Sequence, residues 1–227
     1  MPQAQDFLDE SKALHALLEP LGDAAFGQAT AFKGWTFNDV LRHLHYWNWM
    51  AWLQLNDEPV LIAQMDAIVR AGGMRPVEAA HVDDAGGQAL LALWIAQADA
   101  TAKAYESADP KARLKWVGPD MSARSSITAR LMETWAHGQE IYDQLGVVRQ
   151  NTDGIRNIVV LGINTFGWTF RNRKLDIPEA MPSVVLTAPS GEVWTYGEEG
   201  GADRIEGLAE EFCQVVTQTR NIADTSL

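Results

Sequence analysis

The stretch Arg130-Leu-Met-Glu-Thr-Trp-Ala-His-Gly-Gln-Glu-Ile-Tyr-Asp143 lies in a segment with strong helical character, from about Ser122 to Leu145. Gly146 follows directly, as is typical of a helix C-cap. Within the stretch, Glu133 and His137 stand four residues apart. Four residues make about one helical turn, so both side chains leave the same face and can reach one point, such as a metal ion.

His43 is the companion that would complete such a site. On its predicted helix, Val40, Trp47 and Met50 flank His43 on one side, so we expect it to point inward, whereas His45 projects from nearly the opposite face. One carboxylate and two imidazoles suit a three-ligand divalent-metal site with room for water or substrate. The alternative is a core histidine whose nitrogens are satisfied by other polar groups.

The long helix also permits a simpler interpretation. At about 100° per residue its polar side chains share one strip and its apolar ones lie on another side. The polar strip consists of Ser126, Arg130, Glu133, His137, Glu140 and Gln144, and the apolar side of Ile127, Leu131, Trp135, Ile141 and Leu145. Such a strip can be a solvated face whose Glu/His pair contributes only a few tenths of a kcal/mol.

Composition limits the function classes. The chain has 227 residues, 47% of them hydrophobic and 21% charged, which is ordinary for a soluble globular protein. The formal net charge of −12, with no Lys/Arg-rich run that would reverse it locally, argues against nucleic-acid binding. A single cysteine, Cys213, excludes an intrachain disulfide; its apolar helix predicts a packing role.

The sequence shows no targeting or membrane segment. The first residues lack a basic n-region and an apolar h-region, so we expect no signal peptide. No apolar run approaches the roughly 20 residues that span a bilayer. We therefore expect a cytoplasmic protein without a membrane partner.

Periodicity predicts a helical first part and a mixed second part, with a boundary near residue 150. Thr36 and Asp39 resemble a capping box. The predicted helices cover 4–19, 36–56, 59–72, 87–107, 122–145, 152–171 and 207–219, with a loop at 72–87, a hairpin of 183–187 with 192–196, and a short strand at 204–205.

Several strings carry a family resemblance. Gly34-Trp35, His43-Leu44 and the Glu133/His137 pair together resemble the DinB-type four-helix metalloproteins, and more closely the branch containing mycothiol-dependent maleylpyruvate isomerase. Three further strings are similar to an uncharacterised bacterial subgroup of that branch: Gly118-Pro-Asp-Met-Ser-Ala-Arg124, Leu186-Thr-Ala-Pro-Ser-Gly-Glu-Val-Trp-Thr195 and Phe212-Cys-Gln-Val-Val-Thr-Gln218. The resemblance therefore covers nearly the whole chain.

The resemblance implies a mainly α fold with a small α+β part. Residues 1–150 would form a DinB-like up-down four-helix metal-binding bundle, and residues 151–227 a small C-terminal α+β domain. His43, Glu133 and His137 would bind one divalent ion, most often zinc. Residues of the second domain would help to close the site. An arginine of that domain serves catalysis in the isomerase, and Arg220 matches its position, although subgroup relatives are expected to continue beyond Leu227.

Three ligands leave a position on zinc for water or a substrate thiolate, whose pKa the metal would lower. Glu140, one turn beyond His137, could act as a base or accept a hydrogen bond from a ligand imidazole; a surface carboxylate is the alternative. Arg130 and Arg124 could hold a substrate carboxylate, or form salt bridges. Trp47, Trp49 and Trp52 could line a pocket or an interface, although aromatics at this spacing usually belong to the core.

The leading hypothesis is a metal-dependent, thiol-using transferase or isomerase that acts on a small molecule, with a low-molecular-weight thiol as cosubstrate. The rival is a non-catalytic metal- or small-ligand-binding protein, whose coordination sphere would be closed. A purely structural helical domain, with His43 far from Glu133, is a third hypothesis. The sequence does not distinguish a monomer from a homodimer.

Overall fold

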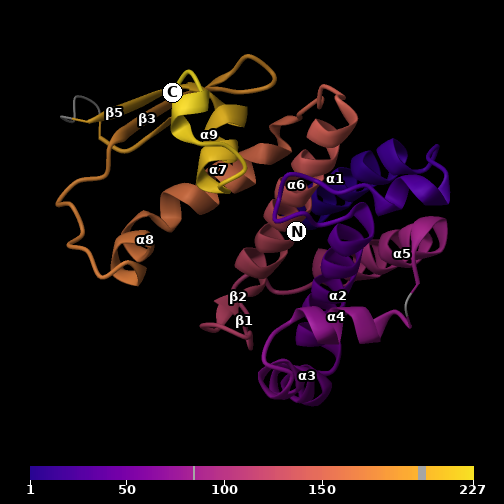
Figure 1. Ribbon diagram of the computed structural model, residues 1–227. Coiled ribbons are helices and arrows are strands. Elements are labelled where there is room, and N and C mark those ends of the chain that lie inside the picture. The colour runs from indigo at the N-terminus through magenta and orange to yellow at the C-terminus, as the bar shows by residue number, and fades with distance from the viewer. Residues whose placement is uncertain (84, 199–202) are drawn as a thin grey trace. The chain divides into compact units, whose positions relative to one another are not determined.

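The computed structural model describes residues 1–83, 85–198 and 203–227. This part of the chain divides into two compact units, Met1–Val148 and Arg149–Leu227. Helices dominate, and short strands form a two-stranded and a three-stranded sheet (Figure 1). The predicted fold class, mainly α with a small α+β part, is confirmed.

Four long helices make up most of the N-terminal unit. Its elements are α1 (Pro2–Leu18), a 3₁₀ turn (Asp23–Gly27), α2 (Phe37–Asn56), α3 (Glu58–Arg70), α4 (Arg75–His81), α5 (Gly87–Glu106), β1 (Arg113–Leu114), β2 (Met121–Ser122) and α6 (Ala123–Leu145). Helices α1 and α2 each pack against both α5 and α6, which brings the four helices alongside one another (Figure 1). Helices α3 and α4 pack against α2.

The two helices that matter most for the site begin and end where the sequence predicts. Asp39 N–H donates to the Thr36 hydroxyl at 3.1 Å and Thr36 N–H donates to the Asp39 carboxylate at 2.9 Å, so the predicted capping box at the start of α2 is confirmed. Gly146 ends α6 with φ of 65°, a left-handed conformation that glycine adopts without steric cost.

A continuous apolar core fixes α2 and α6 in place. Its fully buried members include Phe37, Leu41 and Leu44 of α2, Trp94 of α5 and Ile141 of α6. Each such side chain contributes roughly 1.5–3 kcal/mol through burial. A second apolar cluster contains Trp47 and Met50 of α2, with Trp49 and Trp52 at its edge. The core interpretation therefore holds for Trp47, whereas Trp49 and Trp52 are only partly buried against the cluster.

The segment predicted as a loop, 72–87, contains a helix, and that prediction is wrong. Helix α4 covers Arg75–His81, with Pro76 in its first turn, where the missing N–H leaves no hydrogen bond unmade. Its Glu78 is buried, with 1% of its surface exposed. The short strands β1 and β2 pair with each other between α5 and α6, where no strand is predicted.

In the described part of the C-terminal unit, a sheet is combined with three helices. Its elements are a 3₁₀ turn (Asp153–Ile155), α7 (Arg156–Asn164), α8 (Phe166–Asn172), β3 (Ser183–Thr187), β4 (Val193–Tyr196), β5 (Arg204–Leu208), α9 (Ala209–Val216) and a 3₁₀ turn (Ile222–Asp224). The sheet order is β4-β3-β5; the predicted β3–β4 hairpin is confirmed, and β5 runs parallel to β3. Helix α9 packs against α7, β3 and β5.

Two boundaries in this unit differ from prediction. The single helix expected over 152–171 is interrupted at Thr165, whose hydroxyl donates to the Leu161 carbonyl at 2.8 Å; such side-chain bonds compete with regular helical ones. Strand β5 extends to Leu208, so the last helix begins two residues later than expected. Cys213 of α9 is fully buried, and burial raises the pKa of its thiol, in keeping with packing.

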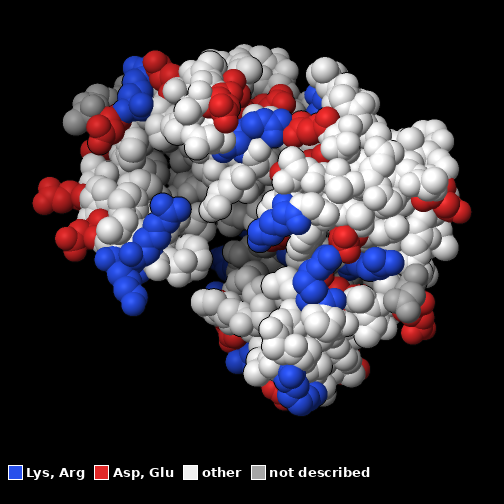
Figure 2. All heavy atoms as spheres, viewed as in Figure 1, with Lys and Arg blue, Asp and Glu red and all other residues white. Residues whose placement is uncertain are grey.

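Surface charges are mixed in sign. On the face shown in Figure 2, acidic and basic side chains of the described residues are interspersed, with no broad basic field. Within the described parts of the chain, no helix has both the length and the apolar character required to cross a membrane.

Candidate metal centre

The structure brings the three predicted ligands together. Helix α2 supplies His43, and α6 supplies Glu133 and His137 from successive turns. Oε2 of Glu133 lies 3.3 Å from Nε2 of His43 and 3.4 Å from Nε2 of His137. All three ligand atoms fall within 4.8 Å of one another. The structural hypothesis that placed His43 far from Glu133 is therefore wrong.

The spacing of these atoms suits a tetrahedral ion. Zinc bonds to nitrogen and oxygen of about 2.0–2.1 Å place neighbouring ligand atoms of a tetrahedron about 3.3–3.4 Å apart. The separations of 3.3 and 3.4 Å match that edge, and they exceed the usual hydrogen-bond range of about 2.7–3.2 Å. The donor set and its geometry thus fit a divalent metal.

A residue that the sequence analysis missed, Glu78, orients His43. Its Oε1 accepts hydrogen bonds from Nδ1 of His43 at 2.8 Å and from Nε1 of Trp47 at 2.9 Å. Both ring nitrogens of His43 face carboxylate oxygens, which only accept; the contact with Glu78 at 2.8 Å is shorter than the contact with Glu133 at 3.3 Å, so we assign the proton of the neutral imidazole to Nδ1. Pro76, which suits the first turn of a helix, is the feature of the sequence that could have predicted α4. No feature of the sequence indicates that Glu78 contacts His43.

This tautomer creates electrostatic repulsion between His43 and Glu133. With the proton on Nδ1, the Nε2 lone pair faces the carboxylate oxygen of Glu133 at 3.3 Å. Two acceptors at this distance repel each other unless a cation lies between them. Either a second proton on His43 or a metal ion between the two atoms would remove this repulsion. An ordinary Glu/His pair on a helix surface has no such requirement for a cation.

The charges of the cluster shift its pKa values. Burial opposes ionisation of Glu133, but the nearby imidazoles of His137 and His43 and the charge of Arg130 outweigh it and hold the pKa well below the ordinary value. Burial also opposes protonation of His43, yet Glu133 and Glu78 raise its pKa overall. For His137, burial and the charges of His43 and Arg130 outweigh the effect of Glu133, so the pKa of the imidazole is lowered. The cluster therefore combines an ionised carboxylate with at least one imidazole that readily stays neutral.

Aromatic rings wall the site on the side of His137. The Trp35 ring stacks on His137, with centroids 5.4 Å apart and planes 10° from parallel, and Phe32 meets His137 edge-on at 5.2 Å. Arg75 of α4 lies over Trp35 at 4.3 Å and donates to Asp39 at 2.6 Å. The start of α2, α4 and the loop before α2 thus together hold the ring of one ligand.

Arg130 lies next to the cluster and is almost completely buried. Its Nη2 is 4.0 Å from Oε1 of Glu133, and only 5% of the residue is exposed. Among the described residues its buried Nη1 has no hydrogen-bond partner. Arg124, in the first turn of α6, is exposed. The interpretation of the polar strip as a solvated face is wrong, because Ser126 and Arg130 are buried.

The two residues predicted to be catalytic are placed as follows. Glu140 lies on α6 one turn beyond His137 and is 9% exposed, so it is not the surface carboxylate of the alternative interpretation. Among the described residues, it lies outside the group of three side chains that could hold a metal ion. Arg220 belongs to the C-terminal unit, where its Nη1 donates to the Thr219 carbonyl at 2.8 Å. A catalytic role for either residue stays a prediction.

Comparison with known proteins decides the family. The family described as Mycothiol maleylpyruvate isomerase N-terminal domain matches residues 7–142, which include all three predicted ligands and Glu78. The chain belongs to the mycothiol maleylpyruvate isomerase family. The resemblance that the sequence motifs predicted is confirmed.

Similarity also extends beyond the matched domain. Proteins from two strains of Mycobacterium tuberculosis, both described as uncharacterised, are 34% identical over 98% of this chain and 87% of their own length. Crystal structures of the mycothiol-dependent maleylpyruvate isomerase, one of them a histidine-to-alanine mutant, match with a TM-score of 0.57 and 17% identity. They cover 95% of this chain and 87% of the isomerase chain, so the fold of this family extends through both units.

Proposed function

We propose that this protein binds one divalent metal ion through His43, Glu133 and His137 and acts as a thiol-using isomerase or transferase on a small molecule. The observation that carries the proposal is the pair of 3.3 and 3.4 Å separations around Oε2 of Glu133, together with the Nδ1 proton of His43 committed to Glu78. Two imidazoles and one carboxylate are a donor set that catalytic zinc sites use, and zinc is the ion we propose. Membership of the isomerase family supports thiol-dependent chemistry.

Three protein ligands leave the coordination sphere open. Glu133 has 30% of its side chain exposed, so the cluster is accessible to solvent rather than sealed. When bound, a divalent ion would act as a Lewis acid and lower the pKa of a coordinated thiol or water. The structural neighbours are named for mycothiol, and a low-molecular-weight thiol of this kind is the proposed cosubstrate.

The side chains around the cluster have separate tasks in this proposal. Glu78 fixes the ring of His43 and keeps its Nε2 free for the ion. Trp35 holds His137 and excludes water from one side. Arg130, with a buried N–H donor left over, would position an anionic group of the substrate. Glu140 and Arg220 are the proposed proton-transferring and charge-stabilising groups.

Metal analysis of the purified full-length protein tests the proposal. We expect about one zinc or other divalent ion per chain, lost in His43→Ala and in His137→Ala. His15→Ala is the matched control, since His15 lies on α1 outside the cluster, and it should retain the metal. A wild-type protein that binds no stoichiometric metal at neutral pH, even after incubation with zinc, would contradict the proposal.

A further inference from the structure

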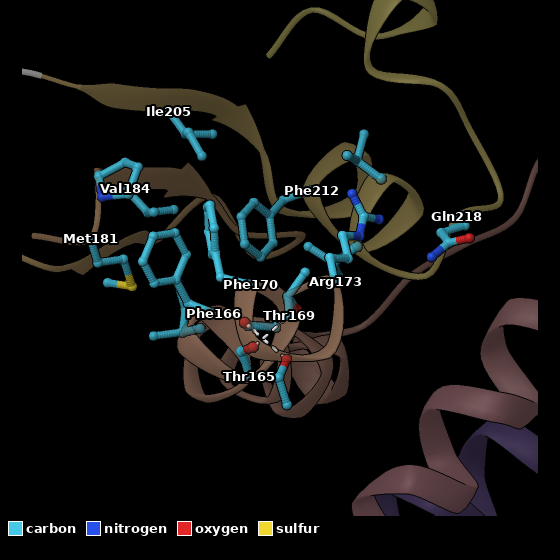
Figure 3. Close-up of a pocket in the computed structure, with 15 residues that line it drawn as sticks. Thr165, Phe166, Thr169, Phe170, Arg173, Met181, Val184, Ile205, Phe212 and Gln218 are labelled. Carbon is cyan, nitrogen blue, oxygen red and sulfur yellow. Dashed lines mark hydrogen bonds between the residues drawn. The ribbon is translucent and has the colours of Figure 1, made fainter. Parts of the chain in front are cut away.

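The C-terminal unit contains a cavity of about 300 Å³ that the proposed chemistry does not use (Figure 3). Its walls come from α7, α8, the segment after α8, β3, β5 and α9, so one unit supplies all of them. This volume is at the lower end of the range for small-molecule sites, roughly 300–1,000 Å³.

The interior of the cavity is apolar. Figure 3 shows the rings of Phe166, Phe170 and Phe212 gathered together, with Met181 and Val184 beside them. The first two rings pack with centroids 5.0 Å apart. Thr165 and Thr169 also line the cavity, but their hydroxyls donate to backbone carbonyls one helical turn earlier, at 2.8 and 3.0 Å. The cavity wall therefore favours a ligand with an apolar body.

One edge of the cavity carries positive charge. Arg173 lines it at the end of α8, on the side toward Gln218 (Figure 3). Arg171 and Lys174 are also exposed, which places three cations within four positions of a chain whose net charge is −12. Within the described residues none of the three forms a salt bridge. An anionic group at this edge would meet uncompensated charge.

We infer that the C-terminal unit binds an amphiphilic carboxylate, with its apolar body among the phenylalanines and its carboxylate at Arg173. At roughly 30 Å³ per water-sized group, the cavity holds about ten such groups, which corresponds to a medium-chain carboxylate such as decanoate. None of the three proposed metal ligands is among the residues that line the cavity.

Calorimetric titration of the full chain with decanoate tests the inference. Decanamide and decylammonium serve as probes with the same body and a neutral or cationic head. We expect decanoate to bind most tightly, with a preference that weakens as salt screens Arg173. Equal affinity for the three probes, or no binding of decanoate, would overturn the inference.

Variants locate the site. Arg173→Gln should weaken decanoate binding by about threefold to tenfold, because an exposed charge contributes modestly, and should leave decanamide binding unchanged. Arg171→Gln is the matched control from the same helix, outside the cavity lining, and should have a smaller effect. Thr169→Phe and, independently, Val215→Phe should fill the cavity and abolish binding of all three probes. Normal binding by both folded variants would place the ligand elsewhere.

Exposed apolar residues near this edge, among them Trp168, Leu175 and Ile177, require one more comparison. Cosedimentation with anionic phosphatidylglycerol vesicles should be weak and should not depend on Thr169→Phe. Strong vesicle binding without any binding of free decanoate would assign the surface to a membrane and overturn the inference.

Discussion

Glu78→Gln is the substitution that most sharply separates a tuned metal centre from three polar residues that happen to be close. Glutamine keeps the size of the side chain but removes its charge. In the native protein one oxygen of Glu78 accepts from both His43 and Trp47, at 2.8 and 2.9 Å, with 1% of the residue exposed. The variant should retain the fold and lose control of the His43 tautomer.

The magnitude follows from these contacts. Loss of an outer-sphere carboxylate typically weakens metal affinity about 10–100-fold, which corresponds to about 1.4–2.7 kcal/mol. In the metal-free state, Glu78→Gln should reduce the free energy of unfolding by less than the loss of a buried ion pair would. The reason is that the amide oxygen of glutamine can still accept one hydrogen bond. A buried donor left with a poorer partner predicts a fall of about 1–3 kcal/mol in the free energy of unfolding.

Chelator competition measures the affinity, and ¹⁵N-detected NMR of the imidazoles reports the tautomer. We expect the metal-free wild type to show His43 with its Nδ1 protonated, and the variant to show a mixture of tautomers. Glu58→Gln, in the exposed first turn of α3, is the matched control and should change neither measurement. Unchanged zinc affinity in a folded Glu78→Gln protein would refute the positioning role of Glu78.

Three further predictions concern stability. Burial would raise the pKa of Asp39, but hydrogen bonds from Thr36 and the interaction with Arg75 lower it overall, below the ordinary value of 3.8. The stability that the ionised carboxylate contributes is therefore fully present above pH 3.8. It is lost as the pH falls through the lower pKa that Asp39 has in the folded protein. Urea titrations of wild type and Asp39→Asn should accordingly differ at pH 6 and converge below pH 3.8, and a constant difference would contradict the assignment. Leu44→Ala, at a fully buried position of α2, should reduce the free energy of unfolding by about 2–5 kcal/mol in urea denaturation, and a loss below ~1 kcal/mol would contradict the core assignment. Zinc at 100 times its dissociation constant should stabilise the wild type by about 2.7 kcal/mol in thermal unfolding; EDTA should reverse the effect, and a similar shift in His137→Ala would place the zinc elsewhere.

The sequence predicted the N-terminal helices well because their signals are local. The Thr36/Asp39 capping box and Gly146 act through contacts within a few residues, so their meaning does not depend on the rest of the fold. The Glu133/His137 pair is local in the same sense, since helical spacing alone places both side chains on one face. Bringing His43 to that face depends on packing between α2 and α6; the inward position of His43 on its helix suggested this, and the family resemblance implied it.

The errors arose where tertiary contacts decide. Glycines around 72–87 suggested a loop, but α4 is held by packing on α2 and by the burial of Glu78 against His43 and Trp47. Polar side chains on α6 suggested a solvated strip, yet Arg130 is buried beside Glu133. In both cases polar groups lie inside the protein and contact the His43/Glu133 cluster, which hydrophobic periodicity does not reveal.

X-ray absorption at the zinc edge, on the full-length protein with and without a low-molecular-weight thiol, tests the central claim most directly. Without thiol, we predict two imidazole nitrogens, carboxylate oxygen and one exchangeable light atom at about 2.0–2.2 Å. With thiol, one sulfur should appear at about 2.3 Å while both imidazoles stay bound. A first shell without imidazole, or a four-ligand protein shell that the thiol leaves unchanged, would contradict the account.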